Sequence, residues 1–511
     1  MKTLTDSKNM KLGVILSYGA MLLSMLGALF VTNRILNLIG DYNYGLYAFV
    51  CSITAWLTVV VSALNASFLR YTTMEANEKN GDVSRTNTMY LKLLVICGAV
   101  VLFVGLSIIA GLYFTHTNFT KYNWHDSCII YGLFALSIFN IALTMPANIF
   151  GLFLNYKKQF VFIQCLSIVT TVINFAGHFI IAYFTKSIVL ICTFTIFSTL
   201  FSTSINAIYC KKRLNIRFSR VKLRENRILV SSIIVFSSIV LFNAIVDQIN
   251  SGVDKTLLGL FSTPMDVTLY QLGQQFNIYM VTMSLAVSGV FSPTIHKLCI
   301  DNSYEKLSDL YYRISKIQII LLCMLTFGFC SCGEDFVKWW IGPERVTAFV
   351  VGAVLMLIDL CPLTMNSSIE IQRAQNKHKF RALIYFLLAL VNVILSVAFL
   401  YILPSEYAIY ACLLGSVIAR IGSHWISMNI YNQKKMHLPV WKYMMTLFKY
   451  MGVGAVCTGA VLLFKMFILT GIESSLVKFI CEGILFVVFY GAFVLIFDRE
   501  TVMGVIKRKF D

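Results

Sequence analysis

The chain has 511 residues, of which 58% are hydrophobic and 13% are charged, and its mean hydropathy is +0.76. These values exclude an ordinary soluble domain. The formal net charge of +18 does not by itself indicate nucleic acid, because basic residues beside anionic headgroups set the topology of membrane proteins. We therefore expect an integral membrane protein with no nucleic-acid partner.

Apolar stretches of about 20 residues recur along the chain, and each is long enough to cross a bilayer core of about 30 Å as a helix. The ninth is the weakest, because it is short and runs into Ser331, Cys332 and Gly333. The pattern predicts an all-α integral membrane protein with about 14 transmembrane helices. In chain order the predicted spans are Leu12–Asn37, Tyr44–Leu69, Leu91–Phe114, Cys128–Leu154, Phe160–Phe184, Ile188–Tyr209, Leu229–Asn250, Val267–Phe291, Ile317–Cys330, Ala348–Ser367, Ala382–Leu403, Ala408–Ile430, Tyr450–Leu469 and Val477–Phe497.

The 42 lysines and arginines are unevenly distributed between the gaps. Most lie in alternate gaps, and the central gap, residues 210–227, is the richest. Loops rich in lysine and arginine stay in the cytoplasm. We therefore predict that this gap is cytoplasmic and that both termini are cytoplasmic as well.

The second half of the chain repeats features of the first at an offset of about 220 residues, which indicates an internal structural repeat. Arg34 lies shortly before Gly40, and Lys255 lies shortly before Gly259. The repeat predicts two six-helix lobes in parallel orientation, residues 1–209 and 228–430, joined by the linker 210–227. Residues 431–511 would add two helices and a cytoplasmic tail outside the repeat.

Polar residues share one face of the seventh predicted span, at the helical spacing i, i+4, i+7 and i+11. The eighth span carries a similar stripe. Such residues either line a hydrated cleft between the lobes, suited to a sugar or a lipid headgroup, or hydrogen-bond neighbouring helices. We expect the cleft, and the residues assigned to it are Asn243, Asp247, Asn250, Asp254, Gln271 and Gln275.

Several kinds of site are missing from the sequence. The 14 cysteines are scattered with no Cys-x-x-Cys, so neither a disulfide framework nor a metal site is indicated. No Gly-Lys dipeptide occurs, which excludes a phosphate-binding P-loop and a built-in ATPase. We expect a protein that is not an enzyme and needs no cofactor. The candidate coupling ions are H⁺ and Na⁺.

Motifs in a fixed order resemble those of a known family. They are the segments 11–18, 34–47, 65–71, 254–259, 339–342 and 372–377. In this respect the chain resembles the Wzx-like polysaccharide-transport flippases of the multidrug/oligosaccharidyl-lipid/polysaccharide (MOP) exporter superfamily. The resemblance covers nearly the whole chain.

The resemblance implies a protein of the bacterial inner membrane. Its substrate would be an undecaprenyl-diphosphate-linked oligosaccharide, the repeat unit of an O-antigen, capsule or exopolysaccharide. A polysaccharide polymerase and a chain-length regulator would be partners, together with membrane lipids. A cationic lumen would receive the diphosphate, and Arg34, Arg70 and Lys255 match motif positions. Arg420 is added because it lies inside a span. The last two spans would hold the lipid tail.

Two alternatives remain. A multidrug or cation antiporter of the related multidrug-extrusion family would be favoured by an acidic residue in the first span. That span instead holds Arg34, and the first acid after Asp6 is Asp41. A membrane glycosyltransferase or polysaccharide polymerase belongs to another class, and the short outer gaps argue against it.

The topology can be tested with a single cysteine. In a cysteine-free background, Lys222→Cys should react with an impermeant thiol reagent only from the cytoplasmic side, because it lies in the basic linker. Labelling from the periplasm would overturn the predicted orientation.

Overall fold

The structure, a computed structural model, describes residues 2–78, 82–115, 123–222, 226–301, 303–375, 377 and 379–498. Within these ranges, 13 helices are long and apolar enough to cross a membrane, or 14 if the bent helix α8 (Pro264–Ile300) counts as one span. The predicted all-α class with about 14 spans is therefore confirmed. Linker residues 223–225 and the predicted tail from residue 499 lie outside the described residues.

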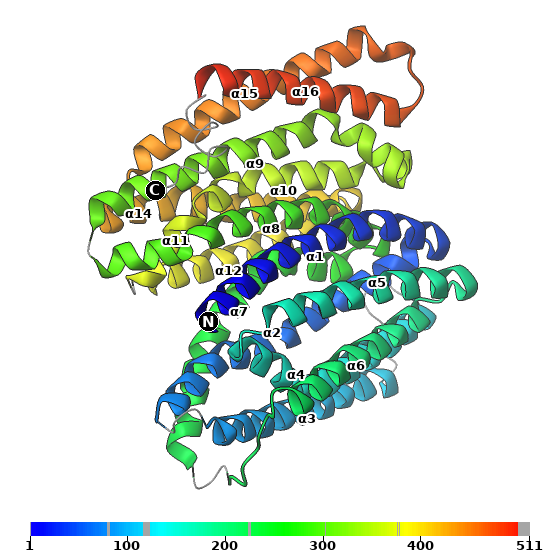
Figure 1. Cartoon of the computed structure of the whole chain (residues 1–511). Coiled ribbons are helices and arrows are strands. Elements are labelled where there is room, and N and C mark those ends of the chain that lie inside the picture. Colours follow the sequence, from blue (N-terminus) through cyan, green and yellow to red (C-terminus); the bar gives the residue numbers. More distant parts are fainter. Residues whose placement is uncertain are drawn as a thin grey trace. The chain divides into compact units, whose positions relative to one another are not determined.

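The chain divides into two compact units, Met1–Thr268 and Leu269–Asp511 (Figure 1). The helices that precede α8 in the first unit are α1 (Lys2–Ile39), α2 (Asp41–Glu78), α3 (Ser84–Phe114), α4 (Trp124–Tyr156), α5 (Phe160–Thr185), α6 (Ile188–Lys212) and α7 (Arg227–Phe261). The spatial division places α7 in the first unit, where it packs on α2. The sequence repeat instead predicts that α7 belongs to the second lobe, residues 228–430. Those lobes describe a sequence repeat and stay a prediction.

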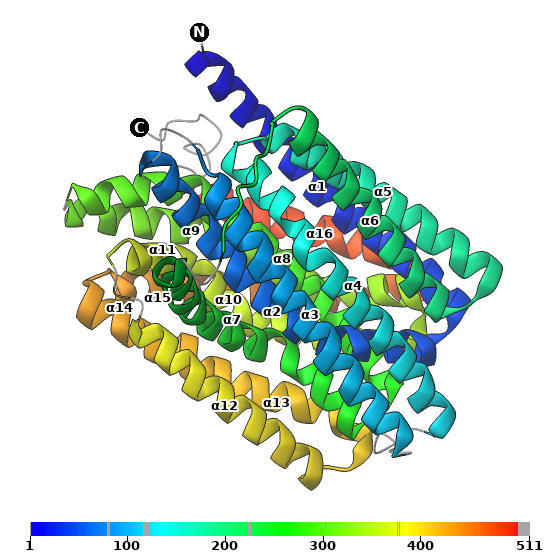
Figure 2. The ribbon, with the colours of Figure 1, turned by 90° about the horizontal axis from the view of Figure 1, so that it is seen from below.

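The second unit contains most of α8 and the rest of the chain. Its helices are α9 (Tyr304–Ile341), α10 (Thr347–Thr364), α11 (Asn366–Ala374), α12 (Lys379–Ile402), α13 (Ala408–Arg420), the π-helix η4 (Ile421–Met428), α14 (Asn429–Met436), α15 (Val440–Phe467) and α16 (Ser475–Phe497). Helices α12 and α13 lie side by side (Figure 2), and α15 and α16 both pack on α9. The two helices outside the repeat are therefore built into this unit.

The ninth span is longer than the sequence predicts. Helix α9 continues past Cys330 and through Gly333 to Ile341. A Cβ atom at Gly333 would lie 2.9 Å from the ring of Phe329 and 3.0 Å from that of Phe349. Glycine therefore serves close packing on α10 here, as small residues do between membrane helices, and does not end the helix.

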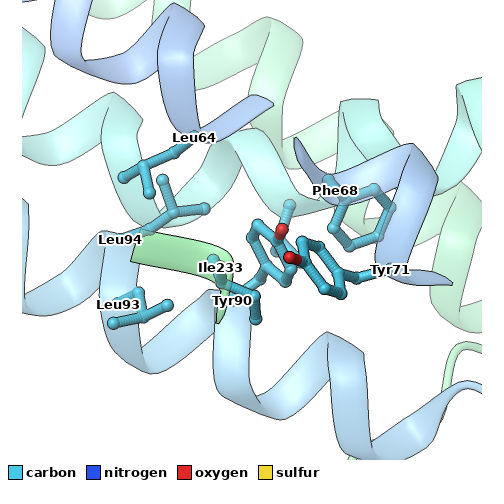
Figure 3. Close-up of a cluster of buried hydrophobic side chains, with 8 residues drawn as sticks. Leu64, Phe68, Tyr71, Tyr90, Leu93, Leu94 and Ile233 are labelled. Carbon is cyan, nitrogen blue, oxygen red and sulfur yellow. The ribbon is translucent and has the colours of Figure 1, made fainter. Parts of the chain in front are cut away.

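A buried cluster joins α2, α3 and α7 in the first unit (Figure 3). Ile233 of α7 lies among the side chains of α2 and α3, and the Tyr90 hydroxyl donates a 2.7 Å hydrogen bond to Ser67. The Ser67 hydroxyl also lies 2.9 Å from that of Ser237 on α7. Because lipid is as apolar as leucine, such a contact is stabilised by close packing and hydrogen bonds, not by removal of apolar surface from water.

The other end of α7 is fixed just as closely. A Cβ atom at Gly45 would lie 1.9 Å from the Pro264 carbonyl oxygen, so only glycine allows the start of α2 to touch the α7–α8 turn. The Thr268 hydroxyl then donates a 2.7 Å hydrogen bond to the Asp41 carbonyl. Helix α7 is thus held along α2 from end to end.

The first part of the basic linker lies against the start of α3. Residues 213–222 form no helix. The backbone amide of Ser219 donates a 3.0 Å hydrogen bond to the Thr88 hydroxyl, and the Asn87 amide donates one of 3.3 Å to the Arg217 carbonyl. These bonds fix the linker on the first unit.

Asp498 joins one end of α9, α15 and α16 in the second unit. Its carboxylate pairs with Lys316 and accepts a hydrogen bond from Tyr450, and Lys449 lies 3.6 Å away. Burial raises the pKa of Asp498, but the Lys316 and Tyr450 hydrogen bonds and the two ammonium charges outweigh it and hold the pKa below its usual value.

Replacing Asp498 should therefore destabilise the second unit. We expect Asp498→Asn to lower the unfolding free energy by about 1–3 kcal/mol, because two ammonium groups lose their carboxylate. The depressed pKa means that this stabilisation is present above the ordinary aspartate pKa and is lost as the pH falls through the folded value. The melting temperatures of the wild type and Asp498→Asn should therefore become equal at acid pH. A difference in melting temperature that stays the same at acid pH would contradict this account.

Candidate functional site

A cavity of about 310 Å³ opens between α2, α4 and α6 of the first unit. Its walls carry hydroxyl, amide and thiol groups among apolar side chains. The lining residues are Tyr47, Cys51, Thr54, Ala55, Thr58, Leu136, Ser137, Asn140, Ile141, Cys192 and Thr195. None of these residues is acidic.

Two features of the cavity wall concern its capacity for hydrogen bonding. Among the described residues, no donor reaches the buried Oδ1 of Asn140, so that atom is left for a donor supplied by a ligand. His178 of α5 lies with its Nε2 3.1 Å from the Thr195 hydroxyl and so orients one wall. The sequence gives no motif for the cavity, because its residues come from three helices and are ordinary in membrane spans.

A cation lies close to the cavity. Lys255 of α7 is near enough to Cys51 for the two groups to interact electrostatically, and Cys51 is part of the cavity wall. Asp254, the next residue in α7, is buried. Lys255 interacts electrostatically with Asp254 as well, so a base and an acid lie together near a cavity whose lining residues are neutral.

The three predicted motif cations occupy both ends of the first unit. Arg34 lies five residues before Ile39, where α1 ends, and Lys255 lies near Cys51 in the first third of α2. Arg70 lies 19 residues after Cys51 on α2, about 28 Å further along the helix. The structure therefore separates Arg70 from the other two.

Arg70 lies against aromatic rings. Its guanidinium carbon is 4.7 Å from the centre of the Phe236 ring on α7 and 5.8 Å from that of Tyr71. Stacking on aromatic faces leaves the guanidinium N–H groups at the ring edges, where they can bind phosphate. Arg34 and Arg70 are both exposed in the structure.

The polar stripe of α7 is not uniform. The side-chain amides of Asn243 and Asn250 donate hydrogen bonds of 2.9 and 3.0 Å to carbonyls one turn earlier in α7. Asp247 is exposed and Asp254 is buried. In the second unit, Gln271 is half-buried and Gln275 donates to the Tyr279 hydroxyl of the same helix. Whether these residues line a cleft between lobes stays a prediction.

Arg420 belongs to a buried polar cluster in the second unit. Its guanidinium lies 3.3 Å from Asp359 of α10, and the Asn277 amide of α8 donates a 2.7 Å hydrogen bond to the same carboxylate oxygen. The π-helix η4 begins at the next residue. On that helix, the His424 ring nitrogen Nδ1 lies 2.8 Å from the Tyr385 hydroxyl. The sequence marks Asp359 and Arg420 as charges inside spans but not as partners.

Asp359 balances the charge of Arg420. We expect Arg420→Met or Asp359→Asn alone to cost about 3–5 kcal/mol of stability, because each leaves one buried charge without its partner. The double variant should cost much less than the sum of the single variants. Melting curves followed with a thiol-reactive dye would measure this, since the described residues include buried free cysteines. Additive single effects would show that the pair is not coupled.

Comparison with known proteins agrees with this architecture. The family described as "Polysaccharide biosynthesis protein" matches residues 35–348. A comparison with curated proteins gave no significant match.

Solved transporters share the fold. A mutant of the MATE transporter VcmN from Vibrio cholerae is 14% identical, with a TM-score of 0.57, over 86% of this chain and 99% of that one. The MATE multidrug transporter DinF-BH is 13% identical, with a TM-score of 0.57, over 83% and 96%. An inward-facing MATE family transporter of the MOP superfamily is 12% identical, with a TM-score of 0.54, over 83% and 99%. At these identities the likeness shows the transporter fold alone.

Proposed function

This chain belongs to the polysaccharide biosynthesis protein family, and from that membership we propose that it flips an undecaprenyl-diphosphate-linked oligosaccharide across a bacterial inner membrane. The movement runs from the cytoplasmic to the periplasmic leaflet by alternating access, and both termini are cytoplasmic. The substrate is a repeat unit of an O-antigen, capsule or exopolysaccharide. A MATE-like fold with 13 or 14 spans supports a transporter over a membrane glycosyltransferase or polymerase.

The composition of the cavity in the first unit carries this proposal. It is lined by hydroxyl and amide groups, holds an open acceptor on Asn140, and has no acid among its lining residues. Sugar hydroxyls donate and accept hydrogen bonds, so such walls suit a sugar. A cationic drug would require a carboxylate or an aromatic cage to compensate its charge. The multidrug antiporter remains the second candidate because its members share the fold.

We propose that the three motif cations serve the diphosphate at the two ends of its route. We assign Arg70 to one end of the first unit, and Arg34 and Lys255 to the other. A diphosphate in a region of low dielectric needs compensating charge, which arginine supplies through bidentate contacts and lysine as a point charge. The polar residues of α7 and α8, from Asn243 to Gln275, would line the route between them.

Arg420 has a different role in this proposal. Its guanidinium is occupied by Asp359, so a phosphate would have to replace that carboxylate. Exchange of one anion for another at a buried arginine avoids leaving a bare charge in the membrane. The last two helices hold the lipid tail, and a polymerase and a chain-length regulator receive the product.

The test is complementation of a flippase-deficient strain that makes the correct lipid-linked oligosaccharide. The triple variant Arg34→Gln, Arg70→Gln, Lys255→Gln should lower export by more than about tenfold, because each charge-assisted contact is worth about 1.5–3 kcal/mol. Blotting of membranes checks that protein levels stay normal.

A charge-matched variant provides the control. Lys186→Gln, Lys211→Gln, Lys297→Gln also removes three exposed positive charges, and none of these residues belongs to the motifs. It should complement normally. Full activity of the first triple variant would show that its residues act only in topology, and a cationic drug resistance phenotype without polysaccharide export would favour the antiporter.

A further inference from the structure

A second group of charges lies where α15 and α16 meet α9 in the second unit, and it includes none of the residues assigned above. Lys465 of α15 pairs with Asp335 of α9, and its ammonium nitrogen lies 3.5 Å from Glu482 of α16 and 3.9 Å from Glu334. Lys338 pairs with Glu334 one turn along α9. Three carboxylates therefore share two ammonium groups.

The surplus negative charge falls on the buried side of this group. Glu482 is fully buried and Asp335 is 3% exposed, whereas the Glu334 side chain is 40% exposed and has Lys338 beside it. Lys465 is then the ammonium group that serves both buried carboxylates. Two ionised carboxylates around one ammonium leave a net charge in an apolar environment, which is strongly unfavourable.

The hydrogen bonding of Glu482 indicates how this charge is relieved. Both of its carboxyl oxygens are buried, and neither accepts a hydrogen bond of good geometry from the described residues, although the Lys465 ammonium lies 3.5 Å from one of them. The Asp335 carboxyl is bound to the same ammonium group, that of Lys465. The nearby thiol of Cys332 already donates to the Gly328 carbonyl, at 3.1 Å. Protonation of one of the two buried carboxyl groups at this ammonium would remove both the repulsion between them and the surplus charge.

We propose that Asp335 and Glu482 form a proton-binding site that holds one proton between them while Lys465 balances the remaining charge. Uptake from water forms one O–H bond and removes one negative charge, and release restores it. The ammonium group already occupies the centre of the site, so a sodium ion there would lie against a positive charge. The titratable and charged groups that face Glu482 in the described structure are Asp335, Lys465 and Cys332.

Infrared difference spectroscopy of the full chain in lipid nanodiscs tests the proton directly. We expect the wild type at mildly acidic pH to show the C=O band of a protonated carboxylic acid. This band should be absent at mildly alkaline pH and should therefore appear in the difference spectrum. Glu482→Gln should abolish this band, because the amide keeps the shape but cannot titrate. Asp498→Asn is the matched control, since Asp498 joins the same three helices through ionised pairs, and it should retain the band.

Thermal melting gives a second readout. A folded protein that holds one proton more than the unfolded chain loses stability as the pH rises, by up to about tenfold in the folding equilibrium per pH unit. The wild type and Asp498→Asn should show this slope near neutral pH, and Glu482→Gln should lose it. A wild-type spectrum without the band, or a band and slope unchanged in Glu482→Gln, would overturn the proposal.

Binding of sodium, instead of a proton, is the alternative that a third measurement tests. At constant pH and ionic strength, replacement of potassium by sodium should leave the melting temperature unchanged. Stabilisation by sodium that disappears in Glu482→Gln would assign the site to that ion and overturn the proton. Use of this proton to drive transport rests on the proposed function, but the infrared and melting measurements need no substrate, so the two ideas can fail separately.

Discussion

The interior of a bilayer offers no water, so every polar or charged group within a span has to find its partner in the protein. The two units meet this requirement differently. In the first, hydroxyls and amides bond to backbone carbonyls and to one another, as Ser67, Tyr90 and Ser237 do. In the second, acids and bases within the spans are paired: Asp359 with Arg420, and Asp335 with Lys465. The second unit therefore contains acid–base pairs within its spans, while the first unit contains a cavity lined by uncharged side chains.

This difference separates two tasks of a transporter. A neutral cavity can bind and release a sugar without a large electrostatic change, because its groups exchange hydrogen bonds of similar strength with water and with hydroxyls. A buried ion pair responds strongly to one added charge, since removal of either partner leaves the other uncompensated. Substrate recognition in the first unit would thus depend on exchange of hydrogen bonds. The response to an anion or a proton in the second unit would depend on the balance of buried charges.

Much of the fold could be predicted from the sequence, because lipid imposes its length and polarity on each helix. The number of spans follows from the length of the apolar stretches alone. For the ninth span only the predicted end was wrong, because Gly333 allows close packing and does not end the helix. The candidate functional site was harder to predict from the sequence. Asp359, Arg420 and Glu482 stand out as charges in apolar stretches, but which acid meets which base depends on helix packing. The cavity residues around Asn140 carry no signal, since serine, threonine and asparagine are common between membrane helices.

The pairing of α2 with α7 has a consequence for biogenesis. Ser52 and Ser67 on α2 bond to Thr256 and Ser237 on α7, partners that lie 204 and 170 residues later in the chain. At a synthesis rate of about 5–20 residues per second, α2 waits about 10–40 s in the membrane before its partner emerges. During that interval the Ser52 and Ser67 hydroxyls can bond to carbonyls of α2 itself but lack their partners on α7. The first unit can therefore be completed only after the ribosome has passed the basic linker, residues 210–227, so the helices up to α6 do not form a complete unit by themselves.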